Sequence, residues 1–262
     1  MTSAPSSLLN AAQRAWQQVA FHQNLLPHIP QSETEVPFIT DADFFNTNGL
    51  ENLITDPSAV SWVILPFNRT GKRFPFAVVE DEQDQENRQK RFCLALSALG
   101  LSENQSDHRF LLVADDATGP VACELCSAIS WEKHQASIIY WTGHLEHLKA
   151  DISAFDPQIL VILAKNVTTE TIPGILTVCV EQAENQPDLS VENVYGWLYS
   201  DQLGFIGHRP PNSQTWQWDK DQFLVETHPY SKLSHITTLN FSLMPFIRYG
   251  LGRTLNKGTS NP

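Results

Sequence analysis

The segment Thr70-Gly71-Lys72 contains residue types that bind phosphate groups in proteins. Small residues let successive backbone N–H groups approach phosphate oxygens, and a lysine adds a positive charge. The preceding Arg69 is bulky, which is unfavourable for such an approach. A solvated turn between two strands is the more common structure for a triplet of this kind. The triplet is therefore a candidate phosphate site, with a turn as the alternative.

Two pairs of potential zinc ligands have usable spacing, Cys123 with Cys126 and His144 with His147. Zinc requires thiolate or imidazole ligands that converge tetrahedrally. Both pairs fall in segments that we expect to be helical and to carry core residues, and cysteine is among the most buried residue types. We therefore predict core thiols and surface histidines, and no bound metal.

Asp115 and Asp116 follow an apolar segment with the character of a buried strand. Ligands bind open α/β sheets at the carboxyl ends of the strands, so this pair is a candidate ligand site. Capping of the next helix is the more common role for such a residue. The sequence contains no G-x-S-x-G motif to indicate a hydrolase.

The composition excludes some classes of partner. The 262 residues include 17 Lys+Arg and 29 Asp+Glu, a net charge of −12. This charge repels phosphates and anionic membranes over long range, so neither nucleic acid nor a membrane is an expected partner. The N-terminus lacks a basic signal region, and no apolar run is long enough to span a bilayer. We expect a cytoplasmic location and four free thiols.

The pattern of apolar residues predicts two kinds of structure. We expect an amphipathic helix over residues 7–26, strands over 61–67 and 76–79, and a helix over 80–99. Strands then alternate with helices from 110 to 163, which predicts parallel β-α-β units. After residue 178, short strands separated by polar loops indicate a mixed or antiparallel lobe. The predicted fold class is α/β, a doubly wound and mostly parallel sheet with a smaller C-terminal β-rich lobe.

The same pattern suggests a division of the chain. We expect a helical segment and linker over 1–60 with a short helix at 41–45, and a parallel α/β core over 61–180. A β-rich lobe packed on the core follows over 181–257, and a disordered tail over 258–262.

Several motifs occur in an order that resembles the large domain of adenylate-forming ligases, in the branch of phenylacetate–coenzyme A ligases. They are Val36–Asp43, Thr70-Gly71-Lys72, Asp156–Leu160, Tyr195-Gly196, Phe223–Glu226 and Met244–Tyr249. The resemblance implies enzymes that join a carboxylate to AMP and pass the acyl group to a thiol, with ATP, Mg²⁺ and CoA.

The sequence departs from that family where its chemistry takes place. Tyr-Gly is followed by Leu198 and Tyr199 at the place of the family's metal-binding glutamate, and Asp201 lies two residues further on. Arg253 stands where an aspartate binds the ribose hydroxyls, and a guanidinium cannot accept those hydrogen bonds. The sequence ends where the family continues into a mobile C-terminal domain. We therefore predict a truncated, degenerate relative with weak or absent ATP binding, no cofactor, and a pocket filled by Tyr199, Trp197 or Arg253.

The resemblance also implies a set of site residues. The candidates for catalysis are Lys72, Asp201 and Arg248, and Thr70, Gly71 and Lys72 are the remnant of the phosphate loop. The predicted substrate-binding residues are Tyr195, Gly196, Trp197, Tyr199 and Arg248. Core packing is the alternative for the aromatic residues, and bracing of a hinge is the alternative for the arginine.

The predicted function is that of a repurposed relative of these ligases. It would bind an acyl or aryl carboxylate, or a carrier-linked acyl group, in a biosynthetic pathway without ATP-dependent ligation. Its partner would then be the small molecule, with a carrier protein or partner enzyme as a further candidate. Two alternatives remain, namely an ATP-independent enzyme for acyl transfer or cyclisation, and a minimal ligase completed by another chain.

Overall fold

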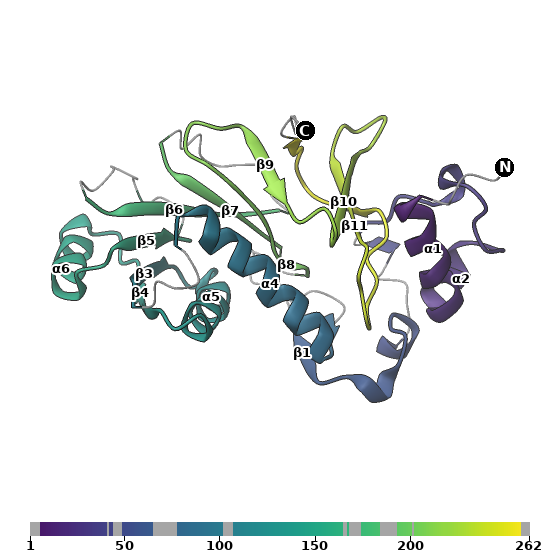
Figure 1. Ribbon diagram of the computed structural model, residues 1–262, viewed down its shortest axis with the longest axis horizontal. Coiled ribbons are helices and arrows are strands. Elements are labelled where there is room, and N and C mark those ends of the chain that lie inside the picture. The colour runs from purple at the N-terminus through teal and green to yellow at the C-terminus, as the bar shows by residue number, and fades with distance from the viewer. Residues whose placement is uncertain are drawn as a thin grey trace.

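An eight-stranded sheet organises most of the chain in the computed structural model (Figure 1). The structure describes residues 6–40, 42–43, 49–64, 78–101, 107–164, 167, 174–183, 193–200 and 202–257. The strand order is β13-β9-β8-β7-β6-β5-β3-β4. The strands are β3 (Arg109–Ala114), β4 (Gln135–Tyr140), β5 (Ile159–Ile162), β6 (Leu176–Gln182), β7 (Tyr195–Ser200), β8 (Gly204–Arg209), β9 (Thr215–Trp218) and β13 (Asn256–Lys257).

The five strands from β4 to β7 are parallel, and helices cover both faces of this part of the sheet. Alternate residues of a strand point to opposite faces. Phe110 and Leu112 accordingly pack with α4 (Glu82–Ala98) and α5 (Gly119–Trp131). Leu111 and Val113 pack with α6 (Leu145–Phe155) on the other face. The predicted doubly wound α/β sheet is confirmed.

The strands predicted before α4 form a separate structure. β1 (Trp62–Ile64) and β2 (Val78–Glu80) make an antiparallel two-stranded sheet outside the parallel one. Antiparallel neighbours need no crossover connection, unlike neighbours in a parallel sheet, so these two strands can pair with each other outside the parallel core. The helix predicted from residue 80 begins at Glu82, because Asp81 accepts a hydrogen bond from the backbone N of Asp84 at 2.8 Å. Glu80 therefore belongs to a strand and faces the interior.

The N-terminal segment is not the single helix expected over residues 7–26. It divides into α1 (Ser7–Gln18) and α2 (Ala20–Leu25), which lie at the opposite end of the molecule from α6 (Figure 1). The break is at Val19, which is fully buried with an extended backbone, φ −127° and ψ 119°. β-Branched residues favour this conformation, and the change of direction lets Phe21 and His22 enter the core as well.

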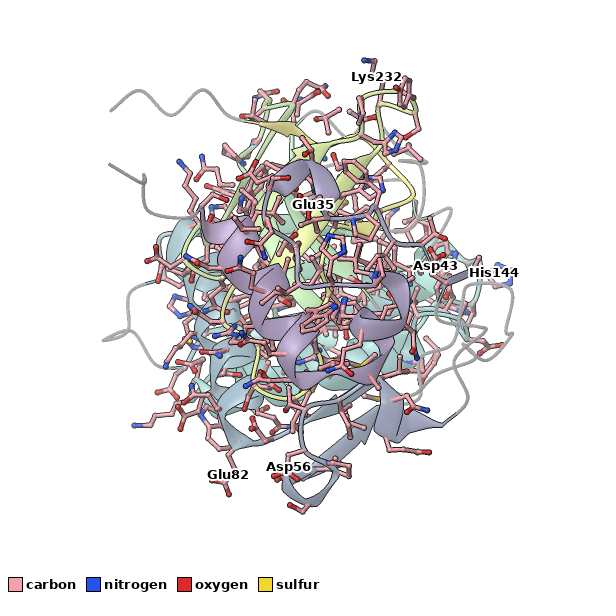
Figure 2. The ribbon with its side chains drawn as sticks, turned by 90° about the vertical axis from the view of Figure 1, so that its right-hand side faces the viewer. Glu35, Asp43, Asp56, Glu82, His144 and Lys232 are labelled. Atoms are coloured by element: carbon pink, nitrogen blue, oxygen red, sulfur yellow. The ribbon has the colours of Figure 1, made fainter. Side chains whose placement is uncertain are left out.

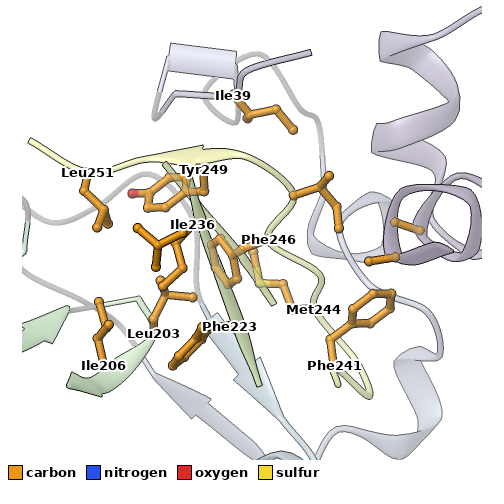
Figure 3. Packing of buried hydrophobic residues seen from close by; sticks show 14 of the residues in the cluster. Ile39, Leu203, Ile206, Phe223, Ile236, Phe241, Met244, Phe246, Tyr249 and Leu251 are labelled. Atoms are coloured by element: carbon orange, nitrogen blue, oxygen red, sulfur yellow. The ribbon is translucent and has the colours of Figure 1, made fainter. Parts of the chain in front are cut away.

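A second, antiparallel sheet forms the predicted smaller lobe. It contains β10 (Phe223–Thr227), β11 (Ser234–Thr238) and β12 (Tyr249–Gly250). Phe223, Ile236 and Phe246 meet at its centre beside residues of the large sheet (Figure 3). Lys232 lies at the tip of the β10–β11 hairpin, far from Glu82 at the opposite edge of the molecule (Figure 2).

The large sheet continues across the domain boundary expected between residues 180 and 181. β6 pairs in parallel with β7, and β8 and β9 then extend the same sheet in antiparallel fashion. Among the described strands after residue 181, β10–β12 form the separate lobe. Short 3-10 helices occur at Glu33–Glu35, Leu50–Asn52 and Pro57–Ala59. The expected tail and most of the helix at 41–45 lie outside the described residues.

Candidate functional site

Each face of the large sheet carries a buried cluster of charged side chains. We call the first the Glu181 cluster, which consists of Glu181, Arg209, Trp216 and Arg253. It lies on the face of Gly196 and Leu198. We call the second the Arg88 cluster, and it consists of Glu80, Arg88, Glu124 and Tyr199. It lies on the face covered by α4 and α5.

In the Glu181 cluster two arginines share one carboxylate. Nη2 of Arg209 donates to Oε1 of Glu181 at 2.9 Å, and Nη2 of Arg253 donates to Oε2 of Glu181 at 2.8 Å. Each guanidinium carbon also lies 5.5 Å from the centre of the Trp216 ring. Both arginines are buried, so they interact in a poorly hydrated environment. Such a cation against a tryptophan face is attracted by the ring.

These described side chains carry a surplus of one positive charge. Arg253 is only 4% exposed, yet its Nε and Nη1 have no hydrogen-bond acceptor among the described residues. Buried polar groups are nearly always paired, and an unpaired charged donor costs more than a neutral one. Within the described part of the chain the cluster is therefore short of an acceptor, and an anionic group would supply it.

The surrounding strands give the cluster its position. Glu181 lies near the carboxyl end of β6, the end at which open α/β sheets bind ligands. A Cβ atom on Gly196 would lie 2.6 Å from Cγ of Arg209. The glycine of the Tyr-Gly motif thus leaves the space in which the arginine reaches Glu181.

In the Arg88 cluster one arginine lies between two carboxylates. Nη1 of Arg88 donates to Oε1 of Glu124 at 2.6 Å, and its Nε donates to Oε1 of Glu80 at 3.0 Å. The hydroxyl of Tyr199 donates to Oε2 of Glu124. Burial lowers the pKa of Arg88, but the charges of Glu124 and Glu80 outweigh it and raise the pKa above its ordinary value. These described groups carry a surplus of one negative charge.

The predicted substrate-binding residues of β7 are at the centre of the sheet. Trp197 and Tyr199 are buried against α4 and α5, which agrees with the core-packing alternative. Tyr195 is half-buried at the start of the strand. Gly196 supports the Glu181 cluster on the other face, so β7 contributes to both clusters.

Arg248 lies apart from the predicted substrate-binding residues of β7. Its Nε and Nη2 donate to the two carboxylate oxygens of Glu226 at 3.0 and 2.8 Å. Its Nη1 donates to the carbonyl oxygens of Glu33 and Val36 at 2.8 and 2.7 Å. The guanidinium also lies 4.6 Å from the centre of the Phe38 ring. These contacts tie the N-terminal segment to the small sheet, which agrees with the bracing alternative, and a part in ligand binding stays a prediction.

Other predicted site residues lie outside the described part of the chain. They are Thr70, Gly71, Lys72 and Asp201. Asp115 is described, and its Oδ1 accepts from the backbone N and the hydroxyl of Thr118, both at 2.9 Å. Asp115 thus closes the turn that leads into α5, whose N-cap residue is Thr118.

The two candidate zinc pairs do not converge. Cys123 and Cys126 lie on α5, where Cys123 is exposed and Cys126 is half-buried, so the prediction of core thiols is wrong for Cys123. His144 and His147 lie exposed at the start of α6, as predicted. These helices pack on opposite faces of the sheet. Within the described ranges, no three His, Cys, Asp or Glu side chains group in a way that could hold a metal. The absence of zinc stays a prediction.

Sequence reasoning missed the charged members of both clusters except Arg253. Glu80 and Arg88 fall within the helix expected over 80–99, and Glu124, Glu181 and Arg209 were not singled out. The glutamates and arginines of a cluster come from different elements, 28 to 72 residues apart for Glu181 with Arg209 and Arg253. No local sequence pattern indicates ion pairs between residues so far apart in the chain. The one available signal was Arg253, at a position where the resembled family has an acid.

Of the comparisons with known proteins, the one with solved structures bears on the fold. No protein-family model matches the sequence, and no curated protein matches it significantly. The structure is similar to 2-hydroxyisobutyryl-CoA ligase in complex with 2-HIB-AMP and CoA. The open conformation matches with a TM-score of 0.65 at 13% identity, over 93% of this chain and 66% of that chain. The thioesterification state matches with a TM-score of 0.63 at 15% identity, over 93% and 61%.

At this identity the likeness establishes the fold alone, and the chain spans about two thirds of the length of these ligases. Their fold is the one that the sequence motifs predicted. The assignment to the phenylacetate–coenzyme A ligase branch stays a prediction. Among the described helices, none combines the length and apolar character needed to cross a bilayer.

Proposed function

We propose that the protein binds an acyl or aryl carboxylate at the Glu181 cluster and does not ligate it with ATP. The observation that carries this proposal is the pair of unpaired donors on Arg253. Each of these two N–H groups can donate to an anionic oxygen, and such charge-assisted bonds are among the strongest in proteins.

The charge of the cluster supports the same class of ligand. One carboxylate from a ligand would balance the surplus positive charge left by Glu181, Arg209 and Arg253. The ring of Trp216 lies beside both guanidiniums and offers an apolar contact for an acyl or aryl body. The fold is shared with ligases whose structures hold 2-HIB-AMP and CoA, so an acyl ligand also fits the ancestry that the motifs imply.

Two contacts support the absence of ATP-dependent ligation. Arg253, where the resembled family has its ribose-binding acid, is turned toward Glu181. Tyr199, where that family has its metal-binding glutamate, donates its hydroxyl to Glu124 and is buried. Neither side chain supplies the carboxylate that would hold the ribose hydroxyls or Mg²⁺. We propose that ATP, Mg²⁺ and CoA are not cofactors.

A binding experiment tests this function. Phenylacetate is titrated into the protein by calorimetry, with Arg253→Met as the test variant and Lys149→Met as the control. Lys149 is an exposed cation on α6 and pairs only with Glu146 in the described structure, at 3.1 Å. We expect phenylacetate affinity to fall at least tenfold in Arg253→Met and to be retained in Lys149→Met.

Equal affinities in the two variants would overturn the assignment of the carboxylate to Arg253. Micromolar Mg·ATP binding, or carboxylate-dependent exchange of pyrophosphate into ATP, would overturn the claim that ligation is lost. The two parts of the proposal therefore fail separately.

A further inference from the structure

A cavity of about 330 Å³ opens between α4 and α5, on the face of the sheet opposite to the Glu181 cluster. Its volume falls in the range of pockets that hold small molecules. The apolar walls are formed by Phe92, Leu125, Ala128, Trp131 and Phe205. An aromatic or aliphatic body of a ligand would be in contact with these side chains.

The polar part of this cavity is acidic. Glu80, Arg88, Glu124 and Tyr199 all line it. Arg88 is paired with both carboxylates and so neutralises only one of them. Glu80 is 7% exposed, and its Oε2 receives no hydrogen bond from the described residues. A buried carboxylate oxygen without a donor is costly, so the cavity is short of a donor and of one positive charge.

The entrance of the cavity favours a cation as well. Trp131, at the end of α5, is 78% exposed beside it. A second hollow of about 520 Å³ shares Trp131, Gln85 and Gln89 with the first. Glu82, Glu86 and Lys90 line this outer hollow, so its charged residues carry a surplus of one negative charge. The face of an indole ring attracts cations, and acidic rims raise the local concentration of positively charged ligands.

We propose that the α4–α5 cavity binds a small primary amine with an aromatic or aliphatic body. The ammonium group donates to Oε2 of Glu80 and balances the surplus negative charge. The body of the amine packs against Phe92, Phe205 and Trp131. This site is separate from the carboxylate site and does not depend on it.

A water molecule is the competing partner of Glu80. A smaller cavity of about 50 Å³ also borders this residue and is lined by Gln202, whose Nε2 has no acceptor within the described residues. A water held there between the two side chains would satisfy both of them. The amine would then gain nothing from Glu80, and it would bind no better than a neutral analogue.

Calorimetric titration of the full chain with phenethylamine and with 2-phenylethanol separates these outcomes. The two molecules have the same body and differ in the ammonium group. We expect phenethylamine to bind with one-to-one stoichiometry and at least tenfold more tightly. We also expect Glu80→Gln to reduce its affinity about tenfold. Equal binding of both molecules, or absence of amine binding, would overturn the proposal.

A surface variant keeps the test valid if Glu80→Gln does not fold. Trp131→Ala removes an exposed side chain, and Tyr230→Ala is its control because Tyr230 is 89% exposed on the distant β10–β11 hairpin. We expect phenethylamine affinity to fall severalfold in Trp131→Ala and to be unchanged in Tyr230→Ala. Unchanged affinity in both variants would place the amine elsewhere and overturn the proposal.

Discussion

The two faces of the large sheet carry clusters of charged side chains with opposite arrangements. On one face Arg88 lies between two carboxylates, and on the other Glu181 lies between two arginines. Each cluster pairs its central residue and leaves a surplus charge of the opposite sign to that residue. Pairing thus explains why the clusters are stable, and the surplus explains which ligand each one would attract.

The comparison also separates residues that hold the fold from residues that recognise ligands. In each cluster the central residue, Arg88 or Glu181, forms ion pairs with both of its oppositely charged neighbours. The unpaired atoms belong to a peripheral residue, Glu80 in one case and Arg253 in the other. Substitution at the centre should therefore affect stability, whereas substitution of Arg253 should affect binding.

The largest effect is expected from Arg88→Met. Its loss leaves the buried Glu80 and the partly exposed Glu124 beside each other without a cation, and breaking a buried pair such as Arg88 with Glu80 costs about 3–5 kcal/mol. Urea unfolding of Arg88→Met and of Lys90→Met measures the effect. Lys90 is on the same helix, but its ion pair with Glu86 is exposed and 3.9 Å long, so we expect little change there. Similar stabilities would show that Arg88 does not hold the two carboxylates.

A smaller loss is expected from Glu181→Gln. The variant leaves Arg209 and Arg253 without a negative partner among the described cluster residues, but the amide oxygen still accepts one hydrogen bond. We expect the free energy of unfolding to fall by roughly 2–4 kcal/mol. Glu146→Gln removes an exposed carboxylate on α6 and is the control. If both variants unfold at the same urea concentration, the shared carboxylate is not structural.

Gly204→Ala tests the packing that holds Arg88. Gly204 has φ +69°, and a Cβ there would lie 2.1 Å from Nη1 of Arg88, so the guanidinium would have to move. Gly143→Ala shares the unfavourable backbone, φ +84°, but has open space around its Cβ. We expect Gly204→Ala to lose about 1–3 kcal/mol more stability than Gly143→Ala. Equal losses would mean that backbone strain explains the whole effect.

The smallest effect on stability is expected from Arg253→Met. Glu181 keeps Arg209, so the charges remain paired, and two buried donors without acceptors are removed. Replacing such a cation with an apolar side chain should change stability by no more than about 1 kcal/mol. Thermal and urea unfolding provide the measurement. A loss as large as that of Arg88→Met would contradict the distinction between central and peripheral residues.

The sequence predicted the layers well where local patterns determine them. The alternation of strands and helices expected from 110 to 163 is present, and β3 and β5 are buried on both faces. The helix expected over 7–26 was divided by Val19, because the core requires a change of direction there that helical spacing does not show. Local periodicity thus predicted elements better than their ends.

The site was harder to predict for a physical reason. Tyr199 was singled out, but its partner Glu124 lies 75 residues away on another helix. Arg248 was expected in a pocket, yet Glu226 and two backbone carbonyls occupy its donors. Charge pairing in a core depends on which elements meet, and this information is absent from local sequence.

The central claim is that the two faces bind ligands of opposite charge independently. The most direct test is to titrate phenethylamine into protein that is already saturated with phenylacetate, using calorimetry. We predict one further binding event, with the affinity that phenethylamine shows for the free protein. Competition between the two ligands, or failure of either to bind, would contradict two separate sites of opposite charge.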